Sequence, residues 1–172
     1  MRLLTAIGFA LLVVTGCGTG EKESKRKKPP ILQSRIKWMT SYADAATKSK
    51  ETGKPIFAFF TGSDWCKYCQ LLDHQILNTE AFATWAKKNV ILLEIDFPNN
   101  KKIDPEIMKV NVTLRDQYRV TGFPTILLLR FDGTPLLKAG YEQVPAERWI
   151  EVIDKKLKES MARLDSEKPA TP

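Results

Sequence analysis

Two cysteines separated by two residues are the strongest chemical signal in this sequence. Cys66 and Cys69 belong to the segment WCKYC, which follows an apolar run and opens a stretch with leucines at helical spacing. At the start of a helix, unpaired backbone N–H groups and the positive end of the helix dipole favour a thiolate on Cys66. Cys69 lies one turn later, close enough to close a ring. The pair predicts thiol–disulfide exchange, in which Cys66 attacks and Cys69 resolves the mixed disulfide.

Other uses of the two cysteines are disfavoured by the rest of the chain. A zinc site takes four ligands as a rule, and beyond the pair the sequence offers only His74 and Cys17 as further cysteine or histidine ligands. Copper delivery requires a wider cysteine spacing, and a structural disulfide across so short a loop adds little stability. We therefore expect no metal and no organic cofactor, only a redox-active disulfide. A binding module that holds extended peptides, with idle or merely sensing cysteines, remains an alternative.

The N-terminus has the features of an export signal. Residues 3–14 form an apolar run of twelve after Arg2. Such a run rises about 18 Å as a helix, short of the ~30 Å bilayer core. The segment VTGC that ends at Cys17 resembles the bacterial lipobox, so residues 1–16 are predicted to be a lipoprotein signal peptide and Cys17 the lipidated residue. The alternative is an ordinary secretory signal that contains a cysteine.

Residues 17–34 are predicted to be a basic flexible tether behind this anchor. Too polar to bury a core, the segment carries most of its charge as a cluster of bases: Lys22, Lys25, Arg26, Lys27 and Lys28, against Glu21 and Glu23. Each base can add about 1 kcal/mol of attraction to an anionic leaflet, or the segment only solubilises the chain. Nucleic-acid binding is not expected, because the bases lack interleaved aromatic residues.

Residues 35–160 are predicted to form one domain, followed by a disordered tail at 161–172. The apolar runs at 56–61 and 90–95 indicate strands covered on both faces, and DG at 132–133 indicates a hairpin. The expected class is α/β, with parallel core strands, a C-terminal antiparallel hairpin and helices on both faces. Expected strands are 36–39, 56–61, 90–95, 126–131 and 135–139; expected helices are 42–51, 66–76, 79–88, 105–118 and 145–157.

Together these motifs resemble the thioredoxin superfamily. WCKYC after an apolar strand is followed by GFPT, by the DG hairpin and by Gly140, and the match covers roughly residues 36–157. The resemblance implies the thioredoxin fold, with Pro124 in the cis form against the disulfide. It also implies a substrate groove made of Trp65, Phe123, Pro124 and Thr125, in which the backbone of Phe123 pairs with an extended substrate.

Within the superfamily, KPIFAFFTGSDWCKYC is most similar to the periplasmic branch of the DsbD C-terminal domain and related lipoproteins. This implies a thiol–disulfide oxidoreductase of the cell envelope, on the periplasmic or extracytoplasmic side, that acts on protein disulfides as a reductant fed by a membrane electron donor. The opposite direction, an oxidant, is the alternative, and we expect a monomer. One departure concerns the proton acceptor, because Phe59 stands where thioredoxin has a buried aspartate. Asp73 matches an acidic residue of the DsbD-type domain and is the candidate acceptor; the alternative is a solvated helix carboxylate.

Overall fold

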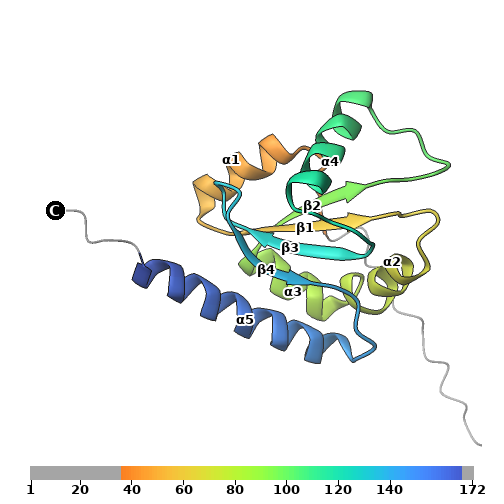
Figure 1. The fold of residues 1–172 in the computed structure, drawn as a ribbon. Coiled ribbons are helices and arrows are strands. Elements are labelled where there is room, and N and C mark those ends of the chain that lie inside the picture. Colours follow the sequence, from red (N-terminus) through yellow and green to blue (C-terminus); the bar gives the residue numbers. More distant parts are fainter. Residues whose placement is uncertain (1–35, 168–172) are drawn as a thin grey trace, which may run out of the picture.

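The computed structural model describes residues 36–167, so the predicted signal peptide, Cys17 and the tether at 17–34 lie outside the described residues. The chain alternates helices and strands before it ends in a hairpin and a long helix (Figure 1). The elements are α1 (Tyr42–Thr52), β1 (Ile56–Thr61), α2 (Lys67–Leu72), the π-helical turn η2 (Asp73–Leu77), α3 (Glu80–Asn89), β2 (Ile91–Asp96), α4 (Pro105–Gln117), β3 (Thr125–Leu129), β4 (Pro135–Ala139) and α5 (Ala146–Glu167).

The strands form one mixed sheet in the order β2-β1-β3-β4. β1 runs parallel to β2, with Phe59 opposite Glu94, and antiparallel to β3, with Phe60 opposite Thr125. β3 and β4 form the antiparallel hairpin predicted from DG. Every residue of β1 is buried, as expected for a strand with helices on both faces. The predicted α/β class with the thioredoxin arrangement is confirmed.

Helices cover the sheet on two sides (Figure 1). Alternate residues of β1 point to opposite faces, so Phe57 and Phe59 belong to a core shared with α2, α3 and α5. Ala58 and Phe60 belong to the second core, which is shared with α1 and α4. The cysteine pair lies in the first core, on the α2 side of the sheet.

Several helix boundaries follow from local sequence. Thr79 caps α3, where its hydroxyl accepts a hydrogen bond from the backbone N–H of Phe82 at 3.2 Å. Pro105 is the first residue of α4, behind the capping residue Asp104. Gly53 ends α1 in the left-handed conformation, with φ of 70°. These residues set where the helices before and after β1 and β2 begin or end.

Two sequence-based expectations about the ends of the domain are wrong. Residues 36–39 form no strand; only Met39 pairs, through an isolated parallel bridge with Leu93, because Ile36 and Trp38 pack against the core and α1 begins shortly afterwards. The tail expected at 161–172 begins too early, because α5 continues to Glu167. Buried Ser160 and the packing of Leu164 on the first core explain this extension.

α5 is the longest helix of the part that the structure describes, and it is amphipathic. Trp149, Ile153 and Leu157 lie at helical spacing on its buried side. Between residues 36 and 167, no helix has both the length and the apolar character that crossing a bilayer requires.

Candidate active site at the start of helix α2

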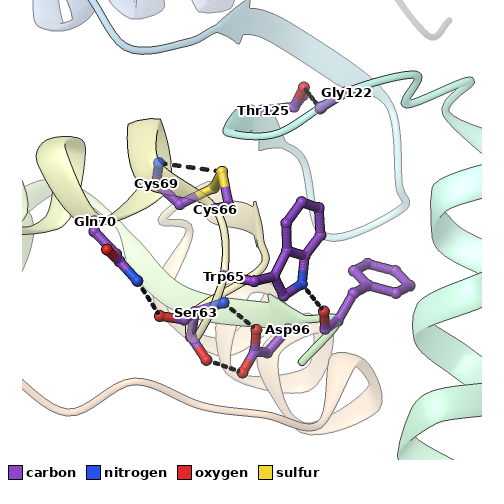
Figure 2. The surroundings of a disulfide bond; sticks show 9 residues. Ser63, Trp65, Cys66, Cys69, Gln70, Asp96, Gly122 and Thr125 are labelled. Atoms are coloured by element: carbon purple, nitrogen blue, oxygen red, sulfur yellow. Dashed lines mark hydrogen bonds between the residues drawn. A yellow bond between two sulfur atoms is a disulfide. The ribbon is translucent and has the colours of Figure 1, made fainter. Parts of the chain in front are cut away.

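Cys66 and Cys69 form a disulfide at the beginning of α2 (Figure 2). Cys66 caps the helix, and its Sγ accepts a hydrogen bond from the backbone N–H of Cys69 at 3.2 Å. The two Cα atoms are 5.2 Å apart, within the usual range for bridged cysteines. Cys66 is 7% exposed and Cys69 1%. Both residues are buried, and the leading cysteine is the more exposed of the two. Cys66 is therefore called the outer cysteine and Cys69 the inner one.

The turn before the disulfide folds Trp65 back over Gly62. The backbone N–H groups of Trp65 and Cys66 both donate to the carbonyl oxygen of Gly62, at 3.2 and 2.8 Å. A Cβ on Gly62 would overlap Cε2 of the Trp65 ring. Glycine is therefore required at this position for the indole to lie across the turn.

This turn is fastened to the loop that follows β2. The Asp96 carboxylate accepts hydrogen bonds from the Ser63 backbone N–H at 2.9 Å and from its hydroxyl at 2.6 Å (Figure 2). Trp65 Nε1 donates to the carbonyl oxygen of Phe97 at 2.7 Å. Asp64 accepts from the backbone N–H groups of residues 99 and 100, and the first of these bonds is the main reason that its pKa is lowered.

Sequence reasoning did not identify Asp64 or Asp96 as parts of the site. A usable signal was present, because Asp96 ends a strand parallel to β1, and the carboxyl ends of parallel strands meet at one edge of the sheet. Its position next to the turn before Cys66 follows from that pairing. The contacts of Asp64 depend on the path of a loop, which no local pattern predicts.

An aromatic surface adjoins Cys66 on the side of the predicted groove. Trp65 is 48% exposed, and its ring meets that of Phe123 edge to face at 6.0 Å. Phe123 also stacks on Phe97 at 5.1 Å. The Phe123–Pro124 peptide bond is cis, as the resemblance implied. The Thr125 hydroxyl donates to the carbonyl oxygen of Gly122 at 2.8 Å and closes the turn before β3 (Figure 2).

A cavity of about 520 Å³ has Cys69 in its lining, but neither Cys66 nor the predicted groove residues. Asp73 also lines this cavity, and its carboxylate accepts a hydrogen bond from the side-chain amide of Asn78 at 2.9 Å. Burial raises the pKa of Asp73, and neighbouring His74 opposes the rise. The structure thus places the candidate acceptor in the same cavity as the inner cysteine. Phe59 forms part of the wall, at the position where thioredoxin has a buried aspartate.

Glu94 also lines this cavity, and sequence reasoning missed it. It lies on β2 directly beside Phe59 in the register of the two strands. Burial raises its pKa, and repulsion by the carboxylates of Asp96 and Asp73 raises it further, while Lys101 opposes the rise. The sequence signal was a lone charged residue within the apolar run VILLEI.

Within residues 36–167, no three side chains of histidine, cysteine, aspartate or glutamate gather in a way that would hold a metal ion.

Comparison with known proteins places this geometry in a family. The family model described as a thioredoxin-like domain matches residues 42–157. The chain is 33% identical over 155 residues to the disulfide bond reductase DsbH of Chlamydia pneumoniae, across 88% of this chain and 93% of the relative.

Two solved structures extend the comparison. One, described as DsbH oxidoreductase, superimposes with a TM-score of 0.70 at 34% identity and covers 79% of this chain and 94% of its own. The reduced C-terminal domain of Neisseria meningitidis DsbD gives a TM-score of 0.52 at 25% identity, over 66% of this chain and 91% of its own. With a Cys66–Cys69 disulfide at the helix start and this fold around it, the chain belongs to the thioredoxin superfamily, in its Dsb-type branch, as a thiol–disulfide oxidoreductase.

Proposed function

We propose that this protein reduces disulfides of other proteins, with Cys66 as the attacking and Cys69 as the resolving cysteine. The observation that carries the proposal is the disulfide at the start of α2, with its outer sulfur beside an exposed aromatic surface. The direction is supported by the 33% identity to a protein named a disulfide bond reductase.

The reaction transfers two electrons from the reduced pair to the substrate. The Cys66 thiolate attacks one substrate sulfur, a mixed disulfide forms, and the other substrate sulfur leaves as a thiolate. Cys69 then loses its proton and attacks Sγ of Cys66, which releases the second substrate thiolate and leaves the Cys66–Cys69 disulfide. Asp73 is the proposed acceptor of that proton, since it lines the same cavity as Cys69.

The proposed substrate is an extended polypeptide segment with its disulfide next to Cys66. Trp65 and Phe123 provide the aromatic wall of the groove, and the exposed indole can contact the substrate. Pro124 and Thr125 complete it at the start of β3, where the backbone of Phe123 pairs with the substrate strand. The pair is regenerated by a dithiol donor in the membrane. In this proposal the protein works as a monomer without metal, organic cofactor or nucleic acid.

We further propose that the protein is an exported lipoprotein of the cell envelope, anchored through Cys17. Two or three acyl chains hold a protein far more firmly than one, and a tether keeps the domain at high local concentration near a membrane donor. Cys17→Ser is therefore expected to move the protein from the membrane to the soluble fraction, as measured by fractionation and immunoblotting. Unchanged membrane association of this variant would show that another segment anchors the chain.

The reduction potential of the Cys66–Cys69 couple tests the proposed direction. We expect a value near that of thioredoxin, about −270 mV, after equilibration in dithiothreitol or glutathione buffers with thiol trapping as the readout. A value near that of DsbA, about −120 mV, would make the protein an oxidant and overturn the proposed direction. Absence of a reversible couple would overturn the enzymatic proposal and favour a peptide-binding module.

A further inference from the structure

The cavity behind Cys69 contains carboxyl groups from two different elements. Asp73 comes from η2 and Glu94 from β2, although they are far apart in the sequence. Glu94 is two residues after Leu92, which belongs to the core on the α2 side, so the alternation of the strand directs its side chain to the same face. Its register partner Phe59 belongs to that core as well. The two carboxyl groups therefore reach the cavity from two elements, the sheet and the π-helical turn.

The cavity is a poor place for two negative charges. Ile36, Trp38 and Phe59 make part of its lining apolar, which disfavours ionised groups. Burial is the largest cause of the raised pKa of both Asp73 and Glu94. For Glu94 the negative charges of Asp96 and Asp73 add to the rise, so an ionised Asp73 disfavours ionisation of Glu94. The pair can thus hold one proton closer to neutral pH than a single exposed carboxyl can.

The charged groups near Glu94 have other hydrogen-bond partners, so the Glu94 carboxyl can hold a proton. The Asp96 carboxylate accepts hydrogen bonds from the backbone N–H and the hydroxyl of Ser63, and the Lys101 ammonium donates to the Ser63 hydroxyl at 3.1 Å. Asp73 accepts from Asn78, whereas no hydrogen bond to the Glu94 carboxyl is found within residues 36–167. The titratable groups around Glu94 are Cys69 on α2, Asp73 and His74 on η2, Asp96 on β2 and Lys101 in the following loop.

We propose that Glu94 is a positioning residue for disulfide exchange, which acts through Asp73 by storing the proton that Cys69 releases. This inference rests on the proposed function. In the resolving step the Cys69 thiol gives its proton to the carboxyl pair, and the resulting thiolate attacks Sγ of Cys66. The bond from Cys66 to the substrate sulfur breaks, and the substrate leaves as a thiolate with the electron pair. When a donor dithiol reduces the disulfide again, the stored proton returns to Cys69.

The pH dependence of the reduction potential measures the proposed coupling, because each linked group adds a break to the curve. Glu94→Gln in the full-length protein is expected to remove one of the two carboxyl breaks on the acid side, while the break of Asp73 remains. It is also expected to move the Cys69 break to lower pH by about one unit or less, since a negative charge leaves the cavity. Asp73→Asn is expected to retain the Glu94 break but at lower pH, because the repulsion is gone. The double variant is expected to show thiol breaks alone.

Two further variants separate this role from a structural one. Glu94→Asp keeps the carboxyl group and is expected to retain both acid-side breaks, whereas Glu51→Gln removes an exposed carboxyl on α1 and is expected to leave the curve unchanged. A Glu94→Gln curve that matches the parent protein, or moves to higher pH, would overturn the inference while the proposed function stands. If the parent protein shows no reversible couple, both fall.

Discussion

Cys66→Ser is expected to abolish disulfide reduction, with a loss of at least about 10³-fold in rate, because the variant lacks the attacking thiolate. Serine nearly matches cysteine in size and is a favourable helix-capping residue. Its hydroxyl can accept the hydrogen bond that Cys66 Sγ receives from the Cys69 backbone N–H at 3.2 Å. The fold around α2 is therefore retained, and the loss is chemical. Reduction of insulin by dithiothreitol at neutral pH, followed by turbidity, measures the effect.

Cys69→Ser is the matched control for that variant. Its outer sulfur remains at the start of α2, so it is expected to attack a substrate disulfide and then accumulate as a mixed disulfide through Cys66. Non-reducing electrophoresis and mass spectrometry detect this species. Full activity of Cys66→Ser, or mixed disulfides formed only through Cys69, would reverse the assigned roles of the two cysteines.

Phe57→Ala is expected to give the largest loss of stability among single core substitutions on β1. Phe57 is fully buried, and its ring contacts four aromatic rings, those of Trp38, Phe82, Trp85 and Trp149. Truncation leaves a cavity at the junction of the sheet with α3 and α5, which costs about 3–5 kcal/mol in the free energy of unfolding. Denaturant titration of the oxidised protein, followed by circular dichroism, measures the change.

Phe131→Ala is the control for the core substitution. Phe131 is 40% exposed, and its ring lies under the Arg130 guanidinium at 5.7 Å, so its truncation is expected to cost at most about 0.5 kcal/mol. The two variants remove the same side chain from the same fold and differ in burial. Equal losses would mean that the aromatic cluster around Phe57 contributes no more than a surface contact.

Features that depend on neighbouring residues were predictable from the sequence. The apolar run at 56–61 identified a strand buried on both faces, Thr79 and Pro105 marked the starts of helices, and DG marked the hairpin. Cys66 and Cys69 are three positions apart, so their pairing at a helix start required no knowledge of distant contacts. Local backbone preference and hydrophobic spacing act over a few residues, and the pattern therefore carried this information.

Features that depend on contacts between distant segments were decided by the tertiary structure. The extension of α5 beyond Ser160 results from the packing of Leu164 on the core, and the single bridge at Met39 results from where β2 lies. Glu94 lines the cavity together with Asp73 because the parallel register sets it beside Phe59. The sequence alone thus determined the redox pair and the family of folds around it. The groups that surround the inner cysteine were decided by strand pairing, since burial and repulsion between carboxyl groups arise only when separate elements pack together.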